Sequence, residues 1–198
     1  MNINHKDTKG TEINTEKNKM ANERAIVFID GNNLYNGLKA CYGIERLDLE
    51  PFCRQIIQQR ELISIYYADA NFISALGQEN YNHQQSYFTH IRKIKGLIFL
   101  EGYYNTKTNP PTEKLADVYL ATAMVDQCHL NTFDIAYLVS GDSDYAPAVD
   151  VLVRMGKRVM NVYFESTKRN SYNLRKHCRG LFKNITRTIA EQYQWRYR

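Results

Sequence analysis

Short apolar runs alternate along this chain with longer segments of helical character. Five runs have the length and bounding turn residues of buried strands, at residues 25–29, 62–68, 97–103, 135–139 and 158–164. Between them, helices are predicted at residues 34–41, 51–57, 113–128 and 144–155 and within 77–93, most of them from apolar residues at helical spacing. Helices between successive strands are crossover connections, so the pattern predicts the α/β class, with a mainly parallel sheet of about five strands covered on both faces.

The start of the chain differs from this alternating pattern. Residues 1–23 are polar and show no periodicity, which is typical of a disordered leader. No run approaches the roughly 18 apolar residues of a membrane span, and the first residues lack the apolar stretch of a signal peptide. We therefore expect a cytoplasmic protein with no membrane partner.

Charge is distributed unevenly along the chain, whose formal net charge is +5. Residues 154–198 contain twelve Lys and Arg and two acidic residues, so this part carries +10 and the first 153 residues carry −5. A basic segment beside an acidic remainder is typical of an enzyme that binds a polyanion and a cation. A solvated basic tail is the alternative interpretation.

Several other chemistries lack the residues that they need. The four cysteines and five histidines are scattered without the spacing of a zinc site, and we interpret the cysteines as reduced thiols. The chain has no GxxxxGK[ST] loop, GxGxxG turn or GxSxG elbow. The sequence therefore does not indicate a P-loop ATPase, a dinucleotide-dependent enzyme or a serine hydrolase.

Carboxylates follow two of the predicted strands. Asp30 comes directly after the first strand, and Asp142 and Asp144 come just after the fourth. Because ligands gather at the carboxyl ends of parallel strands, we expect these acids at one edge of the sheet, where Asp117 of a helical first turn could join them. Clustered carboxylates need a compensating cation, and a site made only of oxygen atoms suits Mg²⁺ or Mn²⁺.

Each of these acids also has a purely structural interpretation. Asp142 or Asp144 could cap the helix that follows, because a carboxylate accepts hydrogen bonds from its first free N–H groups. Asp30 could belong to a simple turn. Asp117 is an ordinary residue for a first helical turn, where an acid interacts favourably with the helix dipole. Position in the sequence alone leaves both interpretations open.

Polar residues near the acids are candidates for substrate contacts. Lys114 precedes Asp117 by three positions, hence on one face of the predicted helix, where it could meet a phosphate or simply stabilise the helix. Asparagine amides can hold a ligand but also favour turns, and a serine can cap a helix. The candidates are Asn32, Asn33, Lys114, Ser140 and Ser143.

Three motifs surround these residues in a fixed order. They are FIDGNN (Phe28–Asn33), EKLADV (Glu113–Val118) and LVSGDSDYAP (Leu138–Pro147), with GKRV (Gly156–Val159) following. Together they resemble the NYN domain, a family of PIN-like nucleases, over roughly residues 24–185. Residues 186–198 then form a basic, aromatic C-terminal extension.

The resemblance implies a Rossmann-like, three-layer α/β/α PIN fold and Mg²⁺-dependent endoribonuclease activity. It implies that Asp30, Asp117 and Asp142 form the core of the metal site, with Asp144 close by as a fourth catalytic acid. Two positions depart from the family's pattern, because Ala123 and Arg179 stand where many members have aspartates. Fewer acids could weaken metal binding, so the alternative function is a non-catalytic module that binds RNA or a nucleotide.

The combined interpretation is a metal-dependent ribonuclease whose partner is RNA. Cations of the C-terminal part would hold the RNA backbone, and aromatic residues among them would stack on unpaired bases. The cations include Lys168, Arg169, Arg175, Lys176 and Lys183, and the aromatic residues are Tyr172, Phe182, Tyr193, Trp195 and Tyr197. A phosphatase of the haloacid-dehalogenase type fits less well, because Asn32 stands where that chemistry needs a second acid. A homo-oligomer is compatible with the sequence.

Overall fold

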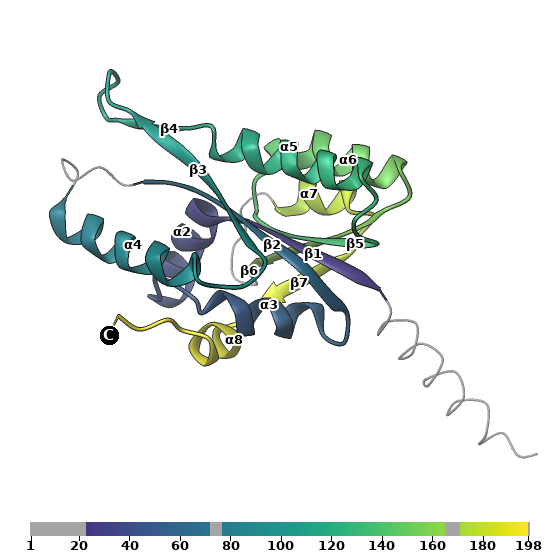
Figure 1. Cartoon of the computed structure of the whole chain (residues 1–198), viewed down its shortest axis with the longest axis horizontal. Coiled ribbons are helices and arrows are strands. Elements are labelled where there is room, and N and C mark those ends of the chain that lie inside the picture. Colours follow the sequence, from purple (N-terminus) through teal and green to yellow (C-terminus); the bar gives the residue numbers. More distant parts are fainter. Residues whose placement is uncertain (1–22, 72–76, 165–170, 198) are drawn as a thin grey trace, which may run out of the picture.

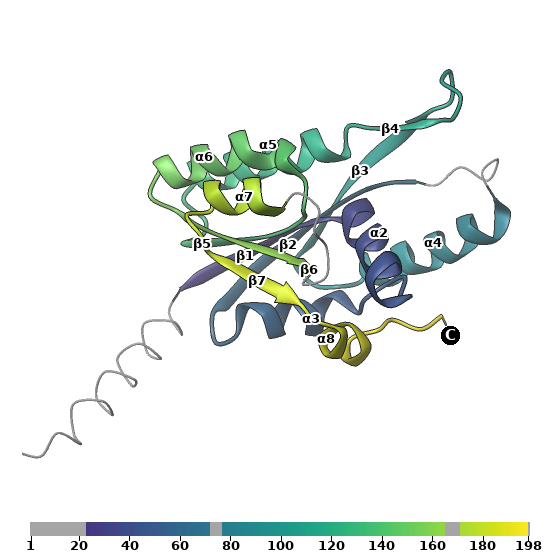
Figure 2. The same ribbon diagram turned by 180° about the vertical axis from the view of Figure 1, so that it is seen from behind.

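A computed structural model describes residues 23–71, 77–164 and 171–197, and these form a seven-stranded sheet between two layers of helices (Figure 1; Figure 2). The strand order is β4-β3-β2-β1-β5-β6-β7. Every neighbouring pair is parallel except β3 and β4, which pair antiparallel. The predicted α/β class with a mainly parallel sheet is confirmed, whereas the predicted number of five strands is too low.

The two additional strands are short and lie at the edges of the sheet. The strands are β1 (Arg24–Asp30), β2 (Glu61–Ala70), β3 (Leu97–Asn105), β4 (Thr112–Lys114), β5 (Ile135–Val139), β6 (Arg158–Phe164) and β7 (Phe182–Ile185). β4 has no buried residue and β7 has one, so neither contains the apolar run from which a strand is predicted. An edge strand needs fewer buried side chains, because it has only one neighbour.

The five predicted helices begin and end close to the predicted positions, with one correction, and two short helices, α7 and α8, were not predicted. They are α2 (Gly31–Tyr42), α3 (Leu49–Ile57), α4 (Gln78–Ile91), α5 (Ala116–His129), α6 (Ala146–Arg154), α7 (Ser171–His177) and α8 (Arg187–Gln192), and a 3₁₀ turn, η2 (Ser143–Tyr145), precedes α6. The helix predicted from Glu113 begins at Ala116 instead, because the residues before it pair with β3 and Leu115 has a left-handed backbone (φ 74°). None of the described helices has the length and apolarity to cross a membrane.

Alternate side chains of β1 supply the two hydrophobic cores of the molecule. Ala25, Val27 and Ile29 face a cluster under α2, α3, α4 and α8, and Ile26 and Phe28 face a second cluster under α5, α6 and α7. All five residues are completely buried, because successive side chains of a central strand point to opposite faces of the sheet. The helices lie on opposite sides of the sheet in both views (Figure 1; Figure 2).

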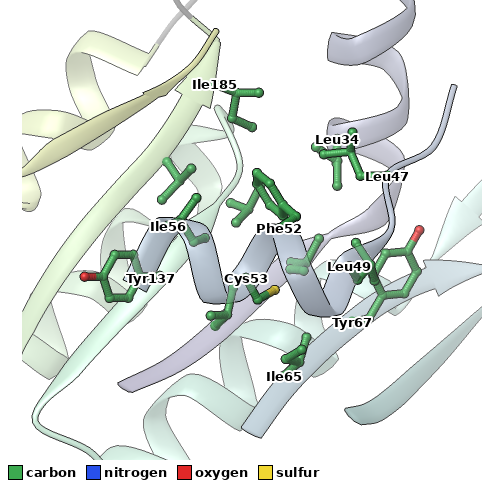
Figure 3. Packing of buried hydrophobic residues seen from close by; sticks show 14 of the residues in the cluster. Leu34, Leu47, Leu49, Phe52, Cys53, Ile56, Ile65, Tyr67, Tyr137 and Ile185 are labelled. Carbon is green, nitrogen blue, oxygen red and sulfur yellow. The ribbon is translucent and has the colours of Figure 1, made fainter. Parts of the chain in front are cut away.

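Helix α3 shows how the first cluster is filled. Phe52 and Ile56 of α3 lie among Tyr67 of β2, Tyr137 of β5 and Ile185 of β7 (Figure 3). One helix thus packs against strands from both halves of the sheet.

The direction in which successive strands are added to the sheet reverses between β1 and β5. From β1 the strands β2 and β3 follow on one side, and β5, β6 and β7 lie on the other. Ile29 is opposite Val139, so Asp30 and Ser140 follow side by side at the carboxyl ends of the two strands. Such a topological switch point opens a crevice that parallel α/β folds use for ligands.

Candidate active site

Asp30 lies at the carboxyl end of β1 and is 6% exposed. Its Oδ1 accepts a hydrogen bond from the backbone N–H of Asn33 (2.9 Å), which caps α2, and its Oδ2 accepts one from the Ser140 hydroxyl (3.1 Å). Burial, with a smaller contribution from the nearby Asp117, raises the pKa of Asp30 to about 7 against the opposing effect of the Asn33 N–H. These hydrogen bonds therefore stabilise the charged form of Asp30 only in part.

The loop after β5 is tied to the loop after β1. The Gly141 N–H donates to Asn33 Oδ1 (3.0 Å), and the Asp142 N–H donates to the Ser140 hydroxyl (3.0 Å). Asp142 caps the 3₁₀ turn η2, because its Oδ1 accepts from the backbone N–H of Asp144 (3.0 Å). The first and third sequence motifs thus form one hydrogen-bonded unit in which Asn33 holds the two loops together.

The start of α5 adds the third element of the site. The Tyr145 hydroxyl donates to Asp117 Oδ1 (3.0 Å), so a buried tyrosine of η2 orients the carboxylate of α5. Lys114 lies on β4 and does not share a helical face with Asp117, contrary to the sequence interpretation, because α5 begins after it. Both residues nevertheless line the same cavity.

This acid cavity, of about 440 Å³, lies at the switch point. Four carboxylates line it, from Asp30, Glu113, Asp117 and Asp142. The other predicted residues in its lining are Asn32, Asn33, Lys114 and Ser143. Ser140 contributes through its hydrogen bond to Asp30, whereas Asp144 is exposed and is not among the lining residues.

Glu113 is a site residue that the sequence interpretation missed. Burial, together with the charges of Asp69, Asp30 and Asp117, raises the pKa of its carboxyl to about 8. Its Oε2 is buried without a hydrogen-bond partner among the described residues. Only the place of Glu113 within the second motif could have singled it out, because β4, the strand that carries it, is not predicted from the sequence.

The acid cavity has the chemistry of a site for a hard divalent cation. Its donors are carboxylate oxygens, which suit Mg²⁺ or Mn²⁺, and the buried Oε2 of Glu113 has no hydrogen-bond partner among the described residues. In the described part of the chain, no three His, Cys, Asp or Glu side chains are gathered closely enough to hold a metal as they stand. The residues thus fit a cation by donor type and charge, and binding would need the carboxylates to draw together.

Comparison with known proteins places this geometry in a family. The family model of the NYN domain matches residues 24–184. The chain belongs to the NYN domain family. Among curated proteins, none matches the sequence. A crystal structure of a protein of unknown function from Vibrio parahaemolyticus is similar over 83% of this chain and 94% of that chain, with a TM-score of 0.63 and 20% identity, which supports the fold alone.

The two positions at which this NYN domain departs from the family's pattern lie outside the acid cavity. Ala123 is on α5 and packs against the second hydrophobic cluster. Arg179 follows α7 and lines a small cavity beside the start of β6, together with Lys157 and Val159. The acid cavity therefore has its four carboxyl groups although neither position 123 nor position 179 carries an acid.

None of the described basic residues of the C-terminal part lines the acid cavity of this NYN domain, although the sequence predicted that some of them would bind the substrate there. The Arg175 guanidinium lies 4.1 Å from the ring centroid of Phe182 and donates to Asn184 Oδ1 (3.4 Å), and Lys183 donates to the backbone oxygen of Ile56 (2.9 Å). Lys176 is exposed on α7, outside the cavity lining. Lys168 and Arg169 lie outside the described residues. Of the predicted substrate-binding cations that are described, Lys114 is the one in the lining.

Proposed function

We propose that this NYN domain is a Mg²⁺- or Mn²⁺-dependent ribonuclease that hydrolyses internal phosphodiester bonds of RNA. The observation that carries the proposal is the convergence of four carboxyl groups in one cavity, from the ends of β1 and β5 and from the β4–α5 segment, where one buried oxygen of Glu113 has no hydrogen-bond partner among the described residues. Membership of the NYN domain, a PIN-like nuclease family, supports the same chemistry. By this proposal, the groups that bind the substrate are the exposed Lys114 and the side-chain amides of Asn32 and Asn33, which line the same cavity.

Asp30, Asp117 and Asp142 are the residues that would hold the cation, with Glu113 as a further ligand from β4. A divalent cation supplies a water of lowered pKa for in-line attack and offsets the charge that develops on the phosphodiester. Asn33 and Ser140 hold the two strand-end loops, and hence Asp30 and Asp142, in a fixed relation. Such preorganisation lets the carboxylates bind without further ordering of the backbone.

Lys114 and Tyr145 act on substrate and site in different ways. Lys114, exposed at the rim of the acid cavity, would bind a phosphate oxygen of the substrate as a point charge. Tyr145 is buried and its hydroxyl donates to the carboxylate of Asp117, so it positions that ligand through this hydrogen bond. Lys114 would thus contribute to RNA affinity, and Tyr145 to the geometry of the acids.

The proposal is tested by a matched pair of substitutions on α5, Asp117→Asn and Asp126→Asn. Asparagine keeps the acceptor for the Tyr145 hydroxyl while removing the charge, and Asp126 is an exposed aspartate of the same helix outside the acid cavity. With end-labelled RNA and Mn²⁺ or Mg²⁺, we expect cleavage by Asp117→Asn to fall at least about 100-fold, because supporting residues alone contribute 10–100-fold to a metal site. Asp126→Asn should cleave like the wild type, and EDTA should abolish cleavage by all three proteins. Equal cleavage by the two variants would refute the assignment.

A non-catalytic module that binds RNA or a nucleotide is the second candidate. It is favoured by the finding that no three described side chains are gathered for a metal as they stand. RNA that stays intact with every metal, while the protein still retains it on a filter, would move the assignment to this candidate. Labelled single-stranded and hairpin RNA should both be tried, because the cavity does not define the substrate's shape.

A further inference from the structure

A second cavity, of about 550 Å³, lies beside the acid cavity between α2, α4 and the C-terminal segment. Its volume is in the range of sites that take a small organic group. Five aromatic side chains line it, from Tyr35, His83, Tyr104, Trp195 and Tyr197. We call it the aromatic cavity. An aromatic lining of this kind favours a flat, unsaturated ligand, because such rings stack face to face or edge to face.

One wall of the aromatic cavity is built by residues beyond the segment that matches the NYN family model. After α8 the chain runs back against the segment before α3, where Gln194 forms a bridge with Leu47 and the Trp195 N–H donates to the Arg46 backbone oxygen (2.9 Å). Trp195 then packs edge-on to Tyr87 of α4, with 5.2 Å between the ring centroids. In both views the C-terminal trace runs from α8 along α4 (Figure 1; Figure 2).

The outer rings of this wall leave faces open to a ligand. Tyr197 stacks on His83 with 5.1 Å between the ring centroids and an angle of 27°, and both side chains are exposed. Tyr197 also lies edge-on to Trp195, with 6.2 Å between the ring centroids, so the rings support one another and a base can stack on them at a small cost in side-chain entropy. Stacking on aromatic side chains is how unpaired bases of single-stranded nucleic acids are bound.

The floor of the aromatic cavity carries a fixed pair of charges. Arg46 lies with its guanidinium 4.5 Å from the Tyr35 ring centroid, and one of its nitrogens is 3.7 Å from Asp69 Oδ2. Asp69 accepts a hydrogen bond from Tyr67 (2.9 Å) and is 4% exposed. The walls add the side-chain amides of Asn80, Gln84 and Gln194. Held donors and acceptors of this kind can read the edge of a base.

The aromatic and acid cavities share a wall. Asn32 and Asn36 line both of them, and the Asn36 amide donates to Asn32 Oδ1 (2.8 Å). A nucleotide whose phosphate lies at the four carboxylates therefore has the aromatic cavity next to it. The two amides between the cavities are placed to meet the sugar.

We propose that the aromatic cavity binds an unpaired base of single-stranded RNA, on the nucleotide next to the phosphate held at the acid cavity. This inference rests on the proposed function, because it takes RNA as the substrate, and it adds that the substrate must be locally unpaired. A paired base has its edge occupied and its faces covered by neighbouring bases, so it cannot enter. The C-terminal segment is then a part of the substrate site rather than a tail.

Trp195 provides a direct probe, because it is the only tryptophan of the 198 residues. A single-stranded RNA of about twelve nucleotides should quench its fluorescence to saturation in EDTA, which prevents metal-dependent cleavage. An abasic strand of the same length and charge should bind more weakly and leave the fluorescence unchanged. Equal quenching by the abasic strand would refute the base site, because the signal would then follow the phosphates.

Tyr197→Ala and Tyr119→Ala form the matched pair for this test. Both tyrosines are exposed, at 59% and 42%, so neither change disturbs the core, and Tyr119 lies on α5 outside both cavities. We expect Tyr197→Ala to weaken binding of the strand about tenfold, the value of one stacked base, and Tyr119→Ala to leave it unchanged. An equal loss in both variants, or in neither, would refute the assignment.

The outcomes separate this inference from the ribonuclease proposal. Cleavage that depends on Asp117, with no quenching of Trp195 by any strand, would refute the base site alone. Base-dependent quenching without metal-dependent cleavage would support the base site and refute the ribonuclease. Mononucleotides that quench as tightly as the strand would overturn the RNA assignment in favour of a free nucleotide.

Discussion

Asp30 caps a helix and lines the acid cavity with the same carboxylate. Its Oδ1 accepts from the first turn of α2, and its Oδ2 accepts from Ser140 of the neighbouring strand end. Capping and a role in the site are therefore compatible for a residue at the carboxyl end of a strand. The next position of the motif, Gly31, requires glycine, because a Cβ there would lie 2.5 Å from the Tyr67 hydroxyl and 2.6 Å from Asp69 Oδ2.

At the residue scale, Glu113→Gln should stabilise the protein while weakening cleavage. Burial and the nearby Asp69, Asp30 and Asp117 raise the pKa of half-buried Glu113 to about 8, so ionisation of this side chain near pH 7 favours the unfolded chain, and a neutral amide removes that cost in the metal-free protein. We expect a gain of about 1 kcal/mol in the free energy of unfolding in EDTA, together with at least about tenfold slower metal-dependent cleavage. Urea unfolding and the RNA assay measure the two effects.

The control for this change is Glu79→Gln, at an exposed position in the first turn of α4 outside both cavities. It should alter neither cleavage nor stability beyond about 0.5 kcal/mol. A loss of stability in Glu113→Gln would show that its carboxylate is compensated in solution. The charge argument for the acid cavity would then fail at this residue.

At the scale of elements, β1 and β5 are clamped at the end opposite the site. The Arg24 N–H and Nε donate to Asp134 Oδ2 (2.9 and 3.2 Å), Nη2 donates to Oδ1 (2.8 Å), and the Asp134 N–H donates to the Arg24 oxygen (2.9 Å). The strands therefore start in a fixed register. That register places Asp30 beside Ser140 at the other end.

The clamp predicts a pH dependence of stability. The hydrogen bonds from Arg24 lower the pKa of Asp134 to about 2, so the folded state binds its proton less readily than the unfolded chain, and the stabilisation is present above pH ~4 and is lost as the pH falls toward 2. The Asp134 side chain is 40% exposed, so we expect the contribution to be only about 0.5 kcal/mol. Asp134→Asn should therefore be less stable than the wild type in urea at pH 6 and nearly equal to it at a pH of about 2. A stability difference that stays the same at both values would contradict this account, and Asp126→Asn is the control.

At the scale of the whole molecule, the basic C-terminal part does not form a separate lobe. Its strands β6 and β7 lie at one side of the sheet, α7 covers one face and α8 the other (Figure 1; Figure 2). Several of its cations are held by the protein itself. Those cations are Lys157, Arg158, Arg175, Lys183 and Arg187.

This distribution limits how strongly RNA binding should depend on salt. Among the described residues, at least five of the twelve cations of the C-terminal part are engaged within the protein, so fewer than twelve can meet phosphates, which predicts a slope of log K against log[salt] less steep than about −8 for single strands. Filter binding of single-stranded RNA in EDTA over a range of KCl concentrations measures the slope. Binding that is unchanged by salt would contradict a phosphate-backbone interaction altogether, and a slope near −8 would mean that the internal contacts break on binding.

The sequence by itself determined the class of fold and the edge of the sheet at which the acids gather. Apolar runs such as 25–29 and 135–139 are local signals, and the acids that follow them must lie at the carboxyl ends of those strands. Asp30 and Asp142 could therefore be placed in one site before any contact was known. Asp117 lies in the first turn of α5, as the pattern predicts, whereas Lys114 lies on β4 instead of the helix, because the pairing of β4 with β3 overrides the helical pattern there.

Only the tertiary structure decided which other residues complete the two cavities. Glu113 reaches the acid cavity through an edge strand without an apolar run, and Trp195 reaches Arg46 by a backbone contact across almost 150 residues of chain. Contacts of this kind depend on how segments distant in the sequence pack together. Such packing gives neither segment an apolar periodicity from which the contact could be predicted. The local pattern thus fixed the acids at the strand ends, and long-range packing fixed the unpartnered carboxylate and the aromatic wall beside them.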